Sequence, residues 1–346
     1  MNDFEKYQKA FSEKAIGNGF STDEINRCLK YSKPIINNGF PIIYNTSHLG
    51  ACIGYNKSYL KRASAYTKSF YKTHVILKKN GKQRYLSEPL PSLKEIQYWI
   101  LENILTKVKI SKYSKAYSAN RSIKDHVRYH KGQKIVLTLD IEGFFDNITL
   151  PKVQDIFLKI GYSKLISNLL AKLCCLEECL PQGAPTSPRI SNIVLNNFDE
   201  VISEYCRKND IKYTRYADDL AFSGDFSSDD LIHLVSTELN HIGLFLNESK
   251  TMVMSGNQRQ IISGIVVNSK AQVPREKRDE LRQALYYIRK HGLEDHLERI
   301  NCTKANYVRH LLGIANYILF INPKDIKTLA IKEELKKYLN EPLLGS

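Results

Sequence analysis

The sequence predicts an α+β fold, in which a centre of mixed strands and helices is followed by a helical tail. Strand-like and helix-like segments alternate between residues 134 and 268, whereas residues 274–346 follow a helical pattern throughout. The chain has 346 residues, of which 42% are hydrophobic and 25% are charged, as is typical of a folded globular protein. Its length suits one large unit with several lobes, or two to three domains of roughly 150 residues each.

The N-terminal part of the chain predicts a basic β-hairpin between helical segments. Asn80-Gly81 is a strong hairpin signal, and lysines surround this turn. Apolar side chains at helical spacing predict a helix with one buried face over residues 93–108. The elements expected before residue 135 are, in chain order: mixed helix and loop over 1–50 with a helix start at Ser21, strands at 73–77 and 84–86, and the helix over 93–108.

The centre of the chain predicts strands separated by helices, and the tail predicts helices only. Pro274 suits a helix start, Gly292 a C-terminal cap, and Pro323 a second stop. The elements expected in the centre are, in chain order: a strand over 134–140, a helix over 151–179, a break at 180–185, a helix over 187–208, two strands within 212–223, a helix over 231–242, and strands at 244–246, 251–254 and 261–268.

Charge is distributed unevenly along the chain. The total is +15, and it divides into +16 over residues 1–135, −6 over residues 136–268 and +5 over residues 269–346. An acidic centre between basic segments is what a nucleic-acid enzyme with a metal site would have, because cations hold phosphates and carboxylates hold divalent metals. A basic protein whose middle is acidic by chance would have the same distribution.

No membrane segment is expected. The longest apolar runs, such as 135–139 and 311–321, fall short of the roughly 18 residues that a membrane helix needs. The first residues, MNDFEKYQKA, contain no apolar core of the kind that a secretory signal has. We therefore expect a cytoplasmic protein with no membrane partner.

Three aspartates stand at the ends of apolar strands. Asp218 and Asp219 lie between two apolar runs, at the expected turn of a hairpin, and Asp140 ends its own apolar strand. Carboxylates in such surroundings repel one another unless a cation neutralises them. Three of them can hold two Mg²⁺ ions about 3.5–4 Å apart, an arrangement that serves phosphoryl transfer. An Asp-Asp pair alone is weak evidence, because Asp229-Asp230 is another such pair in this chain.

Five segments together resemble the motifs of reverse transcriptases, in the order that this family has along its chain. The resemblance covers residues 70–268. Its segments are Lys82-Gln83-Arg84 for the fingers hairpin, 139–145 (LDIEGFF) and 180–188 (LPQGAPTSP) for the first two palm motifs, 216–219 (YADD) for the metal-binding hairpin, and 247–251 (NESKT) for the motif that follows.

The resemblance implies an RNA-directed DNA polymerase shaped like a right hand, with fingers, a palm with an antiparallel sheet, and a helical thumb. The expected bounds are fingers over 51–135, palm over 136–268 and thumb over 269–346. A fingers insertion lies within the palm at about 151–180, and 1–50 forms an N-terminal extension.

The resemblance also implies a catalytic centre with two Mg²⁺ ions, for which Mn²⁺ is a possible substitute. Asp140, Asp218 and Asp219 would bind these ions, with the backbone carbonyl of Ile141 as an additional ligand. Lys250 matches a lysine near the pyrophosphate leaving group, where a cation offsets developing charge. The alternative for Lys250 is a solvated surface lysine.

Four further positions are implied to meet the deoxynucleoside triphosphate (dNTP). Arg84, with Lys82 nearby, would bind the triphosphate, because a guanidinium fork matches phosphate oxygens. The alternative for this pair is a solvated hairpin tip. Phe145 would exclude a ribose 2′-hydroxyl while Phe144 points into the core. Gln182-Gly183 matches the loop that touches nucleotide and template.

Within the family, the chain most resembles bacterial retron reverse transcriptases. Residues 213–220 (YTRYADDL) have the typical form, and the thumb that follows is short. His130 matches the histidine of an Asn-Ala-x-x-His element, although His126 and Val127 replace its Asn and Ala. Gly264 matches the glycine of a Val-Thr-Gly element that is linked to RNA recognition. A hydrogen-bonding structural histidine is the alternative for His130.

The expected thumb combines a basic face with an apolar face. Leu281, Leu285 and Ile288 would face its core. Arg275, Arg278 and Arg282 would hold a nucleic-acid backbone without reading its sequence. Tyr286 and Tyr287 could stack on nucleic acid, but we expect at least one of them to pack in the core.

The retron resemblance implies particular partners. These are a structured non-coding RNA that is both template and primer, its DNA product, dNTPs, and an effector protein of a phage-defence system. The alternatives are another bacterial reverse transcriptase, of the abortive-infection, diversity-generating or group II-intron-like type, or a non-catalytic RNA-binding scaffold.

Overall fold

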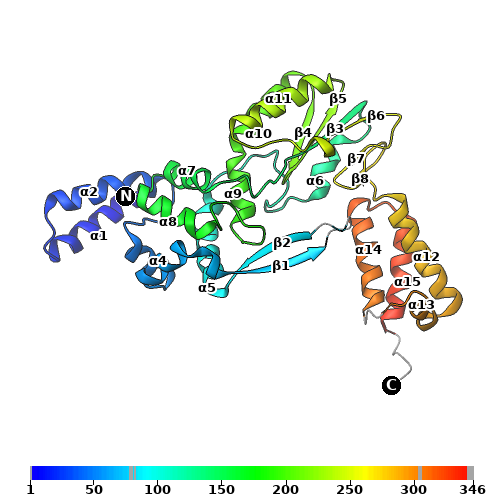
Figure 1. The fold of residues 1–346 in the computed structure, drawn as a ribbon, viewed down its shortest axis with the longest axis horizontal. Coiled ribbons are helices and arrows are strands. Elements are labelled where there is room, and N and C mark those ends of the chain that lie inside the picture. Colours follow the sequence, from blue (N-terminus) through cyan, green and yellow to red (C-terminus); the bar gives the residue numbers. More distant parts are fainter. Residues whose placement is uncertain (1, 78–80, 82, 303–305, 341–346) are drawn as a thin grey trace. The chain divides into compact units, whose positions relative to one another are not determined.

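The computed structural model describes residues 2–77, 81, 83–302 and 306–340, and its helices and antiparallel sheets confirm the α+β class (Figure 1). The chain forms two compact units and passes between them several times. Unit 1 comprises Met1–Ser118, Ile141–Glu204 and His233–Asn247; unit 2 comprises Ala119–Asp140, Tyr205–Ile232 and Glu248–Ser346. These bounds differ from the fingers, palm and thumb bounds expected from sequence, which remain a prediction. Within the described residues, no helix is both long and apolar enough to span a membrane.

Unit 1 begins with short helices. Ser21 caps α2 as predicted, because its side chain and that of Glu24 bond each other's backbone N–H groups in a capping box. Phe4, Ala15, Ile25 and Leu29 form a small apolar cluster of α1 and α2. The helices of this segment are α1 (Asp3–Gly17), α2 (Thr22–Asn37), α3 (Thr46–Ile53) and α4 (Lys57–Ala65), followed by the 3₁₀ turn η1 (Thr67–Phe70).

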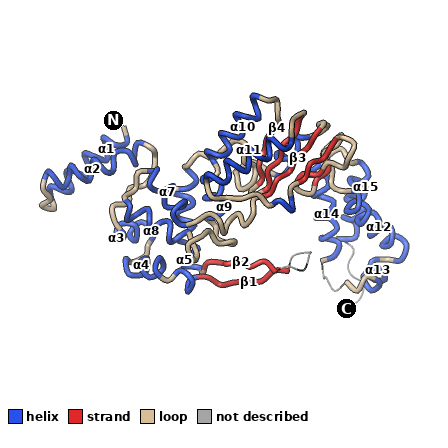
Figure 2. The backbone as a smooth tube through the Cα atoms, turned by 45° about the horizontal axis from the view of Figure 1, so that its top comes forward, coloured by secondary structure: helices blue, strands red, loops and turns tan. Residues whose placement is uncertain are grey.

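The predicted hairpin and helix follow. Strands β1 (Tyr71–Leu77) and β2 (Gln83–Pro89) pair antiparallel, with Ile76 opposite Arg84 (Figure 2). Helix α5 (Pro91–Asn103) and the turn η2 (Leu105–Lys107) occupy the expected helical segment. The side chains of Leu93, Ile96, Ile100 and Ile104 are fully buried, which confirms the apolar face.

Two long helices expected from the sequence are each divided. The segment 151–179 forms α7 (Leu150–Ile160) and α8 (Lys164–Cys174), because Gly161 adopts a left-handed conformation (φ +110°) that ends α7. The segment 187–208 forms α9 (Ser187–Val194) and α10 (Asn196–Lys208). The strand expected at 244–246 is only an isolated bridge between Leu246 and Ile141.

Unit 2 is built on a four-stranded antiparallel sheet with the order β4-β5-β3-β6. Its central strand β3 pairs with β5 from Ile135 opposite Gly224 to Asp140 opposite Asp219. The strands are β3 (Ile135–Asp140), β4 (Lys212–Tyr216), β5 (Asp219–Gly224) and β6 (Met252–Ser255), and the neighbouring elements are α6 (Ile123–Val127), η3 (Arg128–His130), α11 (Ser228–His241) and η4 (Glu248–Lys250).

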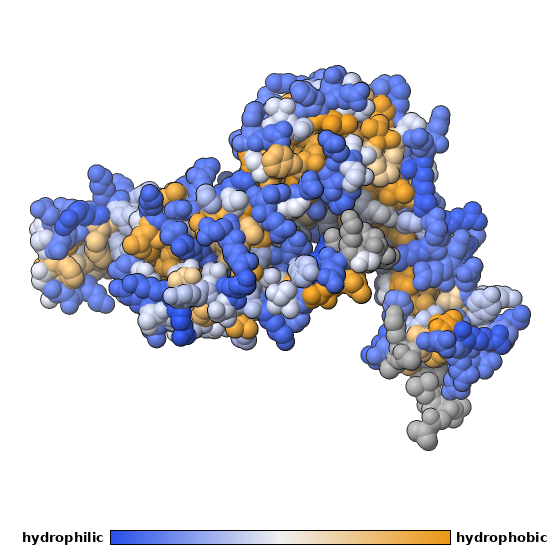
Figure 3. All heavy atoms as spheres, viewed as in Figure 1, coloured by the Kyte–Doolittle hydropathy of each residue, from blue (hydrophilic) through white to orange (hydrophobic). Residues whose placement is uncertain are grey.

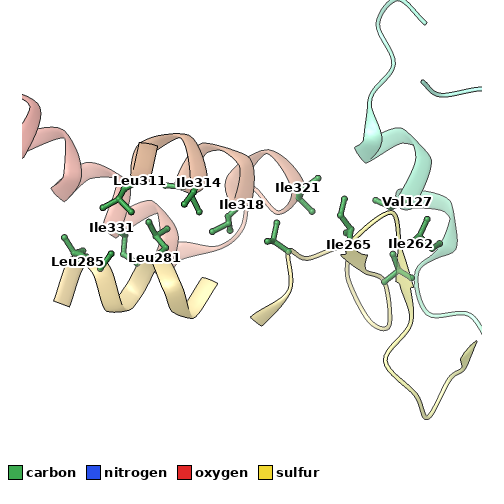
Figure 4. Close-up of a cluster of buried hydrophobic side chains, with 14 of the residues drawn as sticks. Val127, Ile262, Ile265, Leu281, Leu285, Leu311, Ile314, Ile318, Ile321 and Ile331 are labelled. Atoms are coloured by element: carbon green, nitrogen blue, oxygen red, sulfur yellow. The ribbon is translucent and has the colours of Figure 1, made fainter. Parts of the chain in front are cut away.

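The last strands and helices share one apolar cluster, which Figure 4 shows in close-up. Leu281 and Leu285 meet Leu311, Ile314 and Ile331, and Ile318 and Ile321 extend the cluster toward Ile262, Ile265 and Val127. The elements are β7 (Ile261–Ile262), β8 (Ile265–Val266), α12 (Arg275–His291), α13 (Leu293–Arg299), α14 (Tyr307–Ile321) and α15 (Ile326–Asn340). Leu281, Leu285 and Ile288 are therefore core residues, as predicted.

The termini of α12 also agree with the sequence. Pro274 precedes its first residue and Gly292 (φ +87°) ends it. Figure 3 shows hydrophilic side chains along the visible side of α12 and α13. Tyr286 and Tyr287 are about half exposed, at 54% and 45%, so the expectation that one of them packs in the core is wrong. The ring of Tyr287 stacks on that of His296 in α13, with ring centroids 6.2 Å apart.

Candidate active site

Three aspartates gather at one end of the sheet in unit 2. Tyr216 pairs with Asp219, so Ala217 and Asp218 form a two-residue turn between β4 and β5. Ala217 has φ +58°, which such turns require, and its carbonyl accepts a hydrogen bond from Nη1 of the fully buried Arg215 at 3.0 Å. Asp218 therefore stands at the tip of the hairpin, and Asp219 stands directly opposite Asp140 in the ladder.

Burial and mutual repulsion raise the free energy of ionised aspartates at this end of the sheet. Asp140 is only 7% exposed. Burial, with smaller contributions from the charges of Asp218 and Asp140, raises the pKa of Asp219 to about 6. A hydrogen bond from Ser263 and the charge of Lys250 act in the opposite direction. The carboxylates are thus close enough to interact electrostatically, at a site that water solvates poorly.

Two side chains from the segments that follow contact these carboxylates. Lys250, at the end of η4, donates from Nζ to Oδ1 of Asp140 at 2.7 Å, and this bond raises the pKa of Lys250. Ser263, in the turn between β7 and β8, donates from Oγ to Oδ2 of Asp219 at 2.9 Å. Lys250 is therefore a partner of the aspartate cluster rather than an isolated surface lysine.

The cluster has the ligand chemistry of a magnesium site. Carboxylate oxygens are the ligands that Mg²⁺ and Mn²⁺ take in proteins. In the described part of the chain, no group of three or more His, Cys, Asp or Glu side chains already has an arrangement that could hold a metal ion. Asp140, Asp218 and Asp219 nevertheless bring three carboxylates to one end of the sheet, and a divalent cation would offset their mutual repulsion.

The turn that carries Ser263 is itself unusual. Ser263 has φ +45° and Gly264 φ +77°, so both residues of the two-residue turn between β7 and β8 lie in the left-handed region. A left-handed conformation is uncommon for a residue other than glycine, and turns of this type require it. Nothing lies within 4 Å of the position where a Cβ atom of Gly264 would stand, so this turn faces open space.

In unit 1, the Gln182-Gly183 loop is attached to the β-hairpin. The backbone N–H of Ser87 in β2 donates to the carbonyl of Gln182 at 2.7 Å. Gly183 has φ +126°, and a Cβ atom there would approach the Ser87 carbonyl to 2.8 Å, so this position needs glycine. Arg84 is exposed on the same strand, three residues before Ser87. Lys82, also expected to bind nucleotide, lies outside the described residues.

Phe144 is buried and Phe145 is partly exposed, as the sequence predicts. Phe144 is 5% exposed and lies in the core, and Phe145 is half-buried with its ring centroid 5.3 Å from that of Phe144. Ile141 follows Asp140 directly and is held by its bridge to Leu246. The nucleotide contacts of Phe145 and the metal contact of the Ile141 carbonyl remain predictions.

His130 has a structural environment. It is fully buried, and its Nδ1 and Nε2 are each hydrogen-bonded at 2.7 Å, to Ser223 Oγ and to Thr214 Oγ1. His126 is also buried and bonds the same Thr214 hydroxyl through Nδ1 at 2.9 Å. These bonds tie η3 to strands β4 and β5. They favour the structural alternative for His130 over direct contact with RNA, for which it has no exposed surface.

The three arginines expected to hold RNA lie on or near the surface of α12. Arg275 donates to Asp279 at 3.3 Å, and Arg282 forms an ion pair with the same carboxylate. Arg278 is half-buried and donates from Nε to the Val273 carbonyl at 3.1 Å. Two of the three positive charges are therefore partly offset within the helix.

Sequence reasoning missed two residues that shape the site. Arg215 is the largest fully buried side chain in the described part of the chain, and it supports the turn that carries Asp218. A charged residue inside a strand that is otherwise largely buried could have indicated this role for Arg215. Ser263 stands where the Val-Thr-Gly element has its threonine, so a hydroxyl occurs at this position in both, but the sequence alone gave Ser263 no role. Its contact with Asp219 depends on the folding of the later hairpin onto the sheet.

The comparison with protein families agrees with this site. Residues 76–308 match the family of reverse transcriptases, described as RNA-dependent DNA polymerases. This segment contains all three aspartates, Lys250 and Ser263. The chain belongs to the reverse transcriptase family, and it is an RNA-directed DNA polymerase.

Similar proteins indicate which type of reverse transcriptase the chain is. The chain is 31% identical over 318 residues to the retron Ec86 reverse transcriptase of Escherichia coli, covering 89% of this chain and 94% of that protein. It is 29% identical to the retron Ec83 reverse transcriptase of the same species, covering 78% and 90%. The retron Mx65 enzyme of Myxococcus xanthus is 29% identical, with 82% and 68% covered. The protein is thus a retron-type reverse transcriptase.

Solved structures with a similar chain path include telomerases. One is the telomerase of Candida albicans with a fragment of telomeric RNA, at 12% identity and a TM-score of 0.45, covering 78% of this chain and 59% of that chain. Another is the apo telomerase of Candida tropicalis, at 14% identity and a TM-score of 0.43, covering 58% and 47%.

Proposed function

We propose that this enzyme copies part of a structured non-coding RNA into a single-stranded DNA that stays linked to the RNA, by two-metal phosphoryl transfer. The observation that carries the catalytic part is the position of Asp140 opposite Asp219, with Asp218 at the adjoining turn and Lys250 bonded to Asp140. The similarity to retron enzymes over most of the chain supports the choice of substrate.

Each residue of the cluster has a role in this proposal. Asp140, Asp218 and Asp219 hold two Mg²⁺ ions, or Mn²⁺ in their place, and the carbonyl of Ile141 adds a ligand. When bound, the ions lower the pKa of the attacking hydroxyl and neutralise charge on the transferred phosphate. Lys250 provides a positive charge that can turn from Asp140 toward the pyrophosphate as it leaves.

The residues of unit 1 select and hold the nucleotide. Arg84 binds the triphosphate of the incoming dNTP, together with Lys82. Gln182 and Gly183 contact the nucleotide and template, which suits a loop fixed to β2 by the bond from Ser87. Phe145 occupies the space that a ribose 2′-hydroxyl would need.

The partners follow from the retron type. The RNA supplies both template and primer, and its 2′-hydroxyl receives the first nucleotide. Arg275, Arg278 and Arg282 hold the growing RNA–DNA duplex by its backbone, and the turn at Gly264 contributes to RNA recognition. We place the enzyme in the cytoplasm, with an effector protein, as part of a system of phage defence.

The test is to express the gene with its upstream flank, purify the protein and treat the bound nucleic acid separately with RNase and DNase. We expect a short single-stranded DNA joined to RNA, and we expect the Asp218→Asn variant to bind the RNA without this DNA. Bound RNA without linked DNA from the parent protein would overturn the retron product. A separate assay with primer-template and dNTPs would then distinguish another type of reverse transcriptase, which extends the primer, from a non-catalytic scaffold.

A further inference from the structure

Unit 1 contains a hollow that no step of the proposed reaction uses. It has a volume of about 930 Å³, which lies at the upper end of the range for ligand pockets. Segments far apart in the sequence form it: the loop after α2, the segment after η2, α7, the junction of α9 and α10, and the end of α11. All of these segments belong to unit 1.

Hydrogen bonds hold the walls of the hollow in place. Arg189 of α9 donates from Nε to the Leu105 carbonyl and from Nη2 to those of Thr106 and Val108. Asn196 accepts from the Ser111 N–H at 2.9 Å and donates to the Lys109 carbonyl at 2.8 Å. The backbone that carries Lys107 and Lys109 is therefore fixed before any ligand arrives, and preorganisation of this kind lowers the entropic cost of binding.

The side chains around the hollow are strongly basic. Lys107 donates to the Gly39 carbonyl at 2.7 Å, and Lys152 donates to the carbonyls of Asn147 and Gly243 at 2.7 and 3.2 Å. Carbonyl groups satisfy the donors but carry no net charge. Among the described residues that line the hollow, Asp155 is the one carboxylate, and it is paired with Lys159 at 2.7 Å. The positive charges of Lys107, Lys109 and Lys152 therefore remain to attract an anion.

The hollow is also partly apolar. Phe40, Val108, Ile193 and Ile242 line it and are each half-buried, so part of their apolar surface is open to a ligand. Burial lowers the pKa of Lys152, as expected for an ammonium group that is partly desolvated. A lining that combines cations with apolar side chains fits a ligand with a flat apolar part and attached phosphates.

We propose that this hollow binds an unpaired segment of the RNA on which the enzyme works. Phosphates meet Lys107, Lys109 and Lys152, and a base turned out of the strand lies against the apolar side chains of the lining. An unpaired segment fits better than a duplex, because the bases of a duplex are stacked inside it and cannot enter a concave site, whereas those of loops and ends can. This proposal rests on the proposed function only in naming RNA as the partner.

The test compares the full-length protein with its Lys107→Gln/Lys109→Gln double variant. The probe is a fluorescently labelled RNA hairpin with an unpaired loop, titrated at several salt concentrations, with a fully paired RNA duplex as competitor. We expect the double variant to bind the hairpin about tenfold more weakly and its salt dependence to fall by about 1.4 in slope, because two contacts to single-stranded phosphates are lost. The duplex should displace little of the labelled hairpin from the parent protein.

Two variants serve as controls. Lys57→Gln/Lys61→Gln removes two exposed charges from α4 of the same unit and should leave the affinity and the slope nearly unchanged. Lys109→Gln alone leaves the bond from Lys107 to Gly39 intact and should give about half of the loss in slope. Equal affinity and slope in the double variant and the parent, or equal losses in the α4 control, would overturn the proposal. Primer extension by the parent protein is measured separately, so failure of the proposed function is distinguished from failure of this site.

Discussion

The two units of this protein hold clustered charge in different ways. In unit 2, the aspartates at the end of β3 and β5 are contacted by an ammonium group and a hydroxyl, Lys250 and Ser263, which reduce their repulsion. In unit 1, Lys107 and Lys152 rest on neutral backbone carbonyls. A cluster that its own chain partly compensates can position a reactive metal centre, whereas an uncompensated one attracts a polyanion. The partners of a charge, and not the charge alone, therefore indicate its use.

The largest effect is expected from Asp219→Asn. It removes a proposed metal ligand, and DNA synthesis should fall by about a thousandfold or more, because metal ions supply several kcal/mol of stabilisation to phosphoryl transfer. The melting temperature without metal should stay unchanged or rise, since one of three crowded carboxylates becomes neutral while its shape is kept. Single-turnover primer extension and thermal unfolding in EDTA measure these effects. A clear loss of stability with retained synthesis would contradict the metal assignment.

Ser263→Ala should have the next largest effect, because it removes the hydrogen bond that orients Asp219. We expect about a tenfold loss in extension rate, from the value of a hydrogen bond to a charged group, together with a higher Mg²⁺ requirement. Ser263→Thr keeps the hydroxyl and should retain most of the activity. Mn²⁺ binding followed by electron paramagnetic resonance gives a readout apart from turnover. Equal Mn²⁺ affinity and rate in Ala and Thr variants would mean that the hydroxyl does not position Asp219.

Phe145→Ala tests whether unit 1 selects the sugar of the incoming nucleotide without taking part in the phosphoryl transfer itself. Enlarging the space beside the sugar should raise the incorporation of ribonucleotides relative to deoxynucleotides by about tenfold or more, while the rate with dNTPs changes little. Phe144→Leu is the matched control: Phe144 is 5% exposed, so its loss should lower stability without changing sugar selectivity. Competition between the two nucleotides in one extension reaction measures the ratio. An unchanged ratio in Phe145→Ala would remove its selective role.

The smallest effect is expected from Asp279→Asn on α12. This variant tests whether an arginine that is paired with a carboxylate binds nucleic acid more weakly than an unpaired one. Asp279 holds Arg275 and Arg282, so its neutralisation should release both and tighten binding of an RNA–DNA duplex about threefold at low salt. Asp229→Asn removes an exposed charge from α11 and is the control. Fluorescence anisotropy measures both affinities. If both variants bind equally, Asp279 does not restrain these arginines.

Several local features were predictable from the sequence because near neighbours in the chain determine them. The capping box at Ser21, the hairpin around YADD and the apolar face of α12 all follow from residues a few positions apart. The errors were also local: Gly161 ends a helix that was expected to continue, and Tyr286 and Tyr287 both face solvent.

The sequence by itself determined the family, the three aspartates and the course of most helices and strands, because motifs and periodicity are written in adjacent residues. Tertiary structure alone decided which groups meet. Lys250 reaches Asp140 across 110 positions, and Ser263 reaches Asp219 across 44. The structure also buried His130 between Ser223 and Thr214, and it formed the basic hollow from several distant segments. Such contacts depend on strand register and packing, in which the whole chain takes part, so no local pattern contains them.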